Sequence, residues 1–283
     1  MGISAADVKQ LRDRTGAGMM DCKRALTEAG GDMDEAVKIL RTQGLAAASK
    51  KAHRAASEGA VLVAGDGTKM VVLELNCETD FVARNPSFQE LASALAEQAL
   101  SSGVSSVDEL LSQPFEGDSQ HTVEEAISQQ IATIGENIVL SRVAVTEAAP
   151  GNHLSSYVHG NGKIGVVVEG SSAATEEALH DVALHVAASE PRFTTRDEVT
   201  DKVLQVEREI ALKQAIDQGK PEHIAEKIVA GKMEKFFEQE VLLEQPFAKD
   251  TSMSVAQYLR SVGGDDATVA RFVRFKLGEV AGS

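Results

Sequence analysis

The sequence "GAVLVAGDGTKMVVLELNC", from Gly59 to Cys77, decides the fold of the central part of the chain. It consists of two apolar runs separated by Gly65-Asp66-Gly67, a pattern that is typical of a β-hairpin. Near its end, Leu73, Leu75 and Cys77 alternate with polar residues, which predicts a half-buried strand. A polar turn follows, so we expect the strand to end at Cys77.

The same order of elements occurs twice along the chain: a β-hairpin, a helix, a further helical segment and a strand. The second hairpin, "LSSYVHGNGKIGVVVEG", covers residues 154–170 and turns at Gly160-Asn161-Gly162. We expect the helices that follow the two hairpins at residues 87–100 and 175–189. The strands that close the two copies are expected at residues 136–145 and 268–280. This repetition predicts a pseudo-duplicated α+β core.

The second copy contains a much longer helical segment than the first. Apolar residues in it alternate steps of four and three, as in a coiled-coil seam, at Val199, Val203, Val206 and Ile210. Gly219 and Pro221 lie where two antiparallel helices would be joined, with Ile224, Ile228 and Met233 lining the returning helix. We therefore expect an antiparallel helical hairpin inserted at about residues 197–240.

The first 45 residues contain the signals of three short helices. Ser4 is placed to cap the first helix, Gly30-Gly31 ends the second, and Asp32 is placed to cap the third. A bundle of this size is too small to be an enzyme by itself and is typical of a docking module. The basic linker "ASKKAHRAAS" follows it, so we divide the chain into a bundle with linker at 1–54, a first core subdomain at 55–148 and a second one at 149–283.

Charge and composition exclude several classes of protein. A net charge of −15 disfavours extended contact with nucleic acid, whose phosphates must be neutralised by Lys and Arg. The chain has no apolar run long enough to span a membrane and no pattern typical of a signal peptide. Cys22 and Cys77 lie in apolar patterns, which favours buried, reduced thiols over a disulfide. We expect a cytoplasmic protein.

Motifs of catalytic chemistry are absent from the sequence. It has no GxxxxGK[ST] loop, no CxxC and no HExxH, so neither nucleotide hydrolysis nor metal ligation is indicated. Cys77, His159 and Asp80 could be combined into a nucleophilic site. Cys77, however, continues an inward-facing alternation, which favours a neutral packed thiol over an activated one.

Four blocks of this sequence resemble the bacterial elongation factor Ts family: "LRDRTGAGMMDCKRALTEAGGDMDEAV" (11–37), "NCETDFVARNPSF" (76–88), "IGENIVLSRV" (134–143) and "SYVHGNGKIGVVV" (156–168). They run in the same order as in the family and extend over nearly the whole chain. The resemblance implies a guanine nucleotide exchange factor that promotes GDP release from elongation factor Tu during translation. It also implies a ubiquitin-associated-like (UBA-like) N-terminal bundle, two similar core subdomains and a helical hairpin.

The resemblance also implies which residues bind the partner. The segment Thr79-Asp80-Phe81-Val82 would enter the GTPase domain of elongation factor Tu, where the Phe81 ring would displace Mg²⁺. Further partner contacts, including contacts with a second domain of elongation factor Tu, would come from Lys23, Ile134, Gly135 and His159. Such a protein makes no bonds, needs no cofactor of its own, and acts on GDP and Mg²⁺ bound to the partner. Neither nucleic acid nor membrane is an expected partner.

Alternatives remain open on the residues alone. Phe81 could fold back onto its own core, Asp80 could cap the helix after Pro86, and Ile134-Gly135 could be a plain strand entry. The N-terminal bundle could serve an adaptor that binds ubiquitin-like or helical ligands. The segment 114–120 matches the family pattern poorly.

Overall fold

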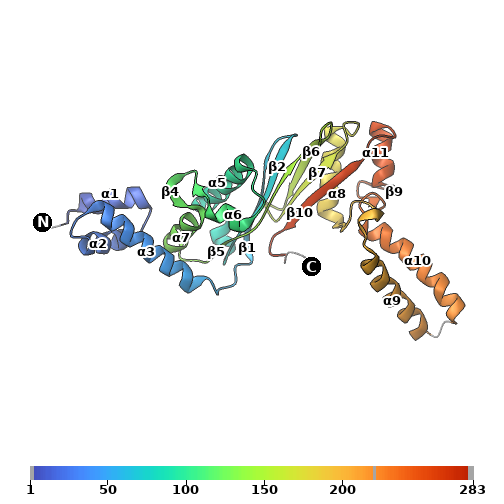
Figure 1. Cartoon of the computed structure of the whole chain (residues 1–283), viewed down its shortest axis with the longest axis horizontal. Coiled ribbons are helices and arrows are strands. Elements are labelled where there is room, and N and C mark those ends of the chain that lie inside the picture. Colours follow the sequence, from blue (N-terminus) through green and yellow to red (C-terminus); the bar gives the residue numbers. More distant parts are fainter. Residues whose placement is uncertain (1–2, 219–220, 280–283) are drawn as a thin grey trace.

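The chain folds into an elongated α+β structure, in agreement with the predicted class (Figure 1). It is known from a computed structural model that describes residues 3–218 and 221–279. The outermost predicted boundaries, residues 1 and 283, and the predicted turn residue Gly219 lie outside the described residues. A bundle of helices lies at one end of the long axis, two β-sheets lie in the middle, and a pair of long helices projects at the other end.

The N-terminal bundle consists of helices α1 (Ala5–Thr15), α2 (Met19–Glu28) and α3 (Met33–Lys51). Ser4 forms a capping box with Asp7, and the Asp32 carboxylate accepts two backbone N–H groups at the start of α3. The small core of the bundle contains Val8, Leu11, Cys22, Ala25, Leu26 and Ala36. Helix α3 continues into the basic linker as far as Lys51, and the remaining linker residues, 52–57, are not helical.

The first sheet is antiparallel in the order β1-β2-β5. Its strands are β1 (Glu58–Gly65), β2 (Lys69–Cys77) and β5 (Ile138–Glu147). The helices around it are α4 (Asp80–Ala83), α5 (Pro86–Ser102), α6 (Val107–Ser112) and α7 (Val123–Ile134), and a small hairpin of β3 (Pro114–Phe115) and β4 (Asp118–Thr122) precedes α7.

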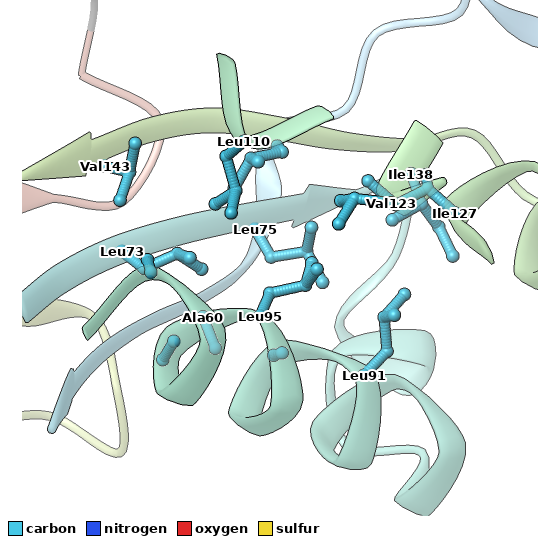
Figure 2. Packing of buried hydrophobic residues seen from close by; sticks show 14 of the residues in the cluster. Ala60, Leu73, Leu75, Leu91, Leu95, Leu110, Val123, Ile127, Ile138 and Val143 are labelled. Carbon is cyan, nitrogen blue, oxygen red and sulfur yellow. The ribbon is translucent and has the colours of Figure 1, made fainter. Parts of the chain in front are cut away.

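The core of this half lies between β2 and α5 (Figure 2). Leu73 and Leu75 point from the strand toward Leu91 and Leu95 of the helix, and all four are buried. Each side chain of this kind stabilises the fold by roughly 1.5–3 kcal/mol. The prediction that β2 ends at Cys77 is confirmed.

The second sheet repeats this arrangement in the order β10-β7-β6. Its strands are β6 (His153–His159), β7 (Ile164–Gly170) and β10 (Val269–Lys276). Helix α8 (Glu176–Ser189) covers it as α5 covers the first sheet, and a hairpin of β8 (Pro246–Phe247) and β9 (Asp250–Ser254) precedes α11 (Val255–Gly263).

The two sheets pack against each other through their other faces. The interface contains Val61, Met70, Val72, Leu154 and Val167. A Cβ at Gly165 would lie 2.6 Å from Val61 Cγ1, so any larger residue in this part of the interface would force the packed side chains to shift. The prediction of a half-buried β2 is therefore wrong: Glu74 and Asn76 are also buried, because the second sheet covers the face on which they lie.

Two Glu–Arg pairs tie the sheets together. Arg142 Nε donates to Glu74 at 2.7 Å, and Arg142 Nη2 reaches across to the Lys276 carbonyl of the second sheet, also at 2.7 Å. In the second sheet, Arg271 Nε donates to Glu169 at 2.6 Å, and Arg271 Nη2 reaches the Glu147 carbonyl of the first at 2.8 Å. Each half of the core thus holds the other by an equivalent contact.

The segment 114–120 belongs to an internal repeat that our reading of the sequence missed. "QPFEGD" begins at Gln113 and "QPFAKD" at Gln245, and both form a short hairpin followed by a helix. Pro114 pairs with Thr122 in the first hairpin, as Pro246 pairs with Ser254 in the second. The repeated Gln-Pro-Phe was the signal in the sequence.

Helices α9 (Asp201–Asp217) and α10 (Glu222–Glu240) form the projecting hairpin, after a short 3₁₀ turn, η1 (Arg196–Glu198). The predicted seam is wrong at Val206 and Ile210, which are 46% and 45% exposed, whereas Val199 is buried and Val203 is partly buried. Of the residues predicted to line the returning helix, Ile224 is exposed, Ile228 is partly buried and Met233 is buried. The residues buried in this hairpin include Ala211, Ala215, Ala225 and Met233. The small alanine side chains allow the two helices to approach closely. Heptad spacing by itself does not show which face of α9 is buried, the face with Ala211 and Ala215 or the face with Val206 and Ile210.

Candidate partner-binding site

The short helix α4 displays Phe81 to solvent. The Phe81 side chain is 81% exposed, more than any other large apolar side chain in the described part of the chain. Thr79 caps the helix, and its hydroxyl accepts the Val82 N–H at 3.3 Å. Val82 packs against the core, so α4 is anchored on one side and presents Phe81 on the other. The alternative that the ring folds back onto its own core is wrong.

Glu136 holds Thr79 from the neighbouring loop. One carboxylate oxygen accepts the Thr79 N–H at 3.0 Å, and the other accepts the Thr79 hydroxyl at 2.8 Å. Our reading of the sequence did not single out Glu136, although it directly follows Gly135 in the block "IGEN".

Ile134 and Gly135 lie at the end of α7 rather than at a plain strand entry. Gly135 ends the helix with a left-handed φ of 94°, and the next strand begins only at Ile138. This turn directs the following residues toward Thr79, so the structure brings the predicted pair close to α4.

The strand end before α4 is fixed by a ring of three hydrogen bonds. Glu78 accepts the Asn137 N–H at 2.7 Å and the Arg54 guanidinium at 3.3 Å, while the Asn137 amide donates to the Arg54 carbonyl at 2.9 Å. The hydrogen bond from Asn137 lowers the pKa of Glu78 below its ordinary value. The end of the basic linker is thereby attached to the base of α4.

Asp80 does not cap the following helix. Asn85 does so, because its side chain accepts the Ser87 N–H at 2.9 Å. The Asp80 carboxylate instead pairs with Arg84 at 2.8 Å and remains half-exposed beside Phe81.

His159 and Lys23 both lie at the surface, on other elements. His159 ends β6, with its Nδ1 at 3.1 Å from the Tyr157 hydroxyl. The turn after it lies at the same end of the sheets as α4, because Lys163 bonds Glu58, which stands opposite Cys77 in the first sheet. Lys23 is exposed on α2. No described contact joins either His159 or Lys23 directly to α4.

The nucleophilic site that Cys77 might form is not assembled. Its thiol is buried and donates to the Thr79 carbonyl at 3.2 Å. Burial, with a smaller contribution from the charge of Glu136, raises the pKa of Cys77 to about 12. A thiol with this pKa stays protonated at neutral pH, so Cys77 acts as a packed core residue.

Residues 3–218 and 221–279 contain no group of three or more His, Cys, Asp or Glu side chains placed to hold a metal ion. In the same part of the chain, no helix is both long and apolar enough to cross a membrane.

A large aromatic side chain fixed on a rigid element and exposed to water is typical of the anchor residue of a protein–protein interface. The fold and site therefore define a protein that docks onto another protein. The family model described as elongation factor TS matches residues 78–279. An elongation factor Ts from Trichlorobacter lovleyi is 45% identical, over 99% of this chain and 94% of its own length. The chain belongs to the elongation factor Ts family, whose members are translation elongation factors.

Proposed function

We propose that this chain is a guanine nucleotide exchange factor that promotes GDP release from elongation factor Tu. The segment Thr79-Asp80-Phe81-Val82 enters the GTPase domain, and the Phe81 ring displaces the Mg²⁺ that bridges protein and nucleotide. The observation that carries this proposal is the exposure of Phe81 on a helix held by hydrogen bonds. Family membership supports the choice of partner.

Exchange without bond chemistry requires that factor and nucleotide weaken each other's binding to the partner by the same ratio. Coupling free energies between linked sites are about 1–3 kcal/mol, and burying one Phe side chain contributes about 1.5–3 kcal/mol. Burial of the Phe81 ring can therefore supply an ordinary coupling, but a stronger exchange factor also needs binding energy from other contacts. Other docking surfaces must offset the distortion of the partner, and we assign this role to Lys23, Ile134, Gly135 and His159.

The parts of the chain have separate roles in this proposal. Residues 1–54 form a UBA-like docking unit with its linker, residues 55–148 carry the inserting segment, and residues 149–283 contact a second domain of elongation factor Tu. The chain acts in the cytoplasm, without a cofactor of its own and without binding nucleic acid or membrane. GDP and Mg²⁺ are ligands of the partner.

Release of a fluorescent GDP analogue from purified elongation factor Tu tests the proposal. The wild-type chain is expected to accelerate release strongly, and Phe81→Ala is expected to lose most of that acceleration. Val262→Ala, which truncates another exposed apolar side chain on α11, is the control and should match the wild type.

Two outcomes would contradict the proposal in different ways. Wild-type rates from Phe81→Ala would exclude the role of the ring. No acceleration by the wild-type chain would exclude exchange activity altogether and favour the adaptor alternative, for which the exposed Met19 and Met20 on α2 offer an apolar surface.

A further inference from the structure

Helix α4 is too short to maintain its own conformation. It spans four residues, far fewer than a helix needs to be stable in water. Phe81 adds little to its stability, because an exposed ring buries almost no surface. The orientation of Phe81 must therefore be set by groups outside the helix.

The Glu136 carboxylate is such a group, because it binds both hydrogen-bond donors of Thr79, the residue that caps α4. Its two oxygens accept the Thr79 N–H and the Thr79 hydroxyl, and that hydroxyl in turn accepts the Val82 N–H. Hydrogen bonds to an ionised acceptor are stronger than bonds between neutral groups. The contacts thus run from Glu136 through Thr79 into the helix that carries Phe81.

Glu136 is itself held on a fixed support. It follows α7, whose Ile127 and Ile131 are buried in the core of the first sheet. The next residue, Asn137, is buried and donates its N–H to Glu78, at the other side of the α4 base. The carboxylate therefore has a defined position relative to the sheet, and its bonds to Thr79 fix the position of α4 as well.

We propose that Glu136 is a positioning residue, which sets α4 and the Phe81 ring in the binding orientation before the partner arrives. This inference rests on the proposed function. It adds Glu136, a residue that the family resemblance did not supply, to the residues that carry out that function. Ordering a segment in advance lowers the cost of binding, so Glu136 acts on affinity through Phe81. Only a carboxylate offers two acceptors here, since glutamine would accept one of the two Thr79 donors.

A double-mutant cycle on affinity tests this inference. Dissociation constants for nucleotide-free elongation factor Tu would be measured for the wild type, Glu136→Gln, Phe81→Ala and the double variant. Glu136→Gln is expected to weaken binding about 10- to 150-fold, as for loss of a hydrogen bond to a charged group. In the Phe81→Ala background the same change should have less than about a twofold effect, because the ring that Glu136 positions is gone. Glu124→Gln, which removes an exposed charge from α7, is the control and should bind as the wild type does.

An equal effect of Glu136→Gln in both backgrounds would overturn the inference, because Glu136 would then contribute independently of Phe81. Amide hydrogen exchange of the free proteins provides a readout that does not depend on the partner. The Val82 and Ala83 amides should exchange faster with solvent in Glu136→Gln than in the wild type, while the circular dichroism spectrum shows that the fold is retained. Unchanged exchange at these amides would also overturn the inference. If the wild-type chain fails to accelerate GDP release, only the proposed function is contradicted. The amide hydrogen exchange of the free proteins still decides whether Glu136 positions α4.

Discussion

Cys77 and Phe81 are four residues apart and have opposite surroundings. The alternation with Leu73 and Leu75 predicted a buried thiol at Cys77, and the structure confirms it. No local pattern could decide whether Phe81 is exposed, because the group that holds its helix, Glu136, lies 57 residues beyond Thr79 in the sequence. The exposure of Phe81 thus depends on a contact that only the folded chain creates.

The raised pKa of Cys77 predicts an effect of pH on stability. The folded state favours the neutral thiol, so its contribution is fully present below the unfolded pKa of about 9 and is lost as the pH rises toward 12. The free energy of unfolding should therefore fall more between pH 8 and pH 10.5 in the wild type than in Cys77→Ala. Urea denaturation of both proteins at the two pH values measures this difference.

Cys77→Ala should also leave GDP release within about twofold of wild type, and the thiol should resist alkylation at pH 8 until the protein unfolds. Rapid alkylation of the folded protein, or equal pH dependence in both proteins, would contradict this account of Cys77.

At the scale of elements, the repeated hairpins are held by different side chains that form the same bonds. Gln98 of α5 accepts the Glu116 N–H at 3.1 Å and donates to the Gln113 side chain at 3.1 Å. His185 of α8 replaces it in the second copy. Its Nδ1 accepts the Ala248 N–H at 3.0 Å, and its Nε2 lies 2.8 Å from Gln245 Oε1. These bonds require a neutral imidazole.

His185→Gln should therefore retain most of the stability, within about 1 kcal/mol of the wild type. His185→Leu should lose about 2–4 kcal/mol, because it leaves the Ala248 N–H and the oxygen of the buried Gln245 side chain without their partner. Chemical denaturation at pH 7.5 measures both values. Equal losses in the two variants would contradict the assigned bonds.

Burial lowers the pKa of His185, so the sign of its pH effect is opposite to that of Cys77. Its contribution is fully present above the unfolded pKa of about 6.5 and is lost as the pH falls through the lower pKa of the folded state. Lowering the pH from 7.5 to 5.5 should destabilise the wild type more than His185→Gln. Parallel loss in both proteins would show that His185 does not titrate in this way.

The elements themselves were largely predictable, because their ends are marked by local residues. Ser4, Asp32 and Gly135 begin or end helices through their own side chains or backbone conformation. The seam of the helical hairpin was not predictable in this way. Val206 and Ile210 fit the heptad, but the small residues Ala211 and Ala215 allow closer packing. Which face of α9 is buried depends on its packing against α10.

At the scale of the whole molecule, packing of one sheet on the other explains what the repeats could not reveal. Glu74 and Glu169 occupy equivalent places in β2 and β7, and both are buried because each strand is covered on both faces. Repetition predicted two similar halves, but it could not predict that their sheets pack face to face. The alternation in β2 therefore indicated a strand with one exposed face.

The two Glu–Arg pairs should differ in their contribution to stability. The Arg142 side chain is 13% exposed and that of Arg271 is 54% exposed. Arg142→Met leaves a buried carboxylate without its cation and should cost about 3–5 kcal/mol. Arg271→Met also leaves a buried carboxylate, that of Glu169, but should cost less, about 1–2 kcal/mol, because the half-exposed guanidinium is already partly hydrated and the Ala149 N–H and the Asn152 amide still donate to Glu169. Thermal and urea unfolding of the two variants provide the comparison, and equal losses would contradict the reading of the interface.

Release of bound GDP from elongation factor Tu, with and without Mg²⁺, tests the central claim most directly. If the chain acts by displacing the metal ion, it should accelerate release strongly in Mg²⁺ and by a much smaller factor after chelation, because the step it promotes has already occurred. Phe81→Ala should show little acceleration in either condition. Acceleration by the same factor with and without Mg²⁺ would contradict the mechanism, and no acceleration in Mg²⁺ would contradict the proposed function itself.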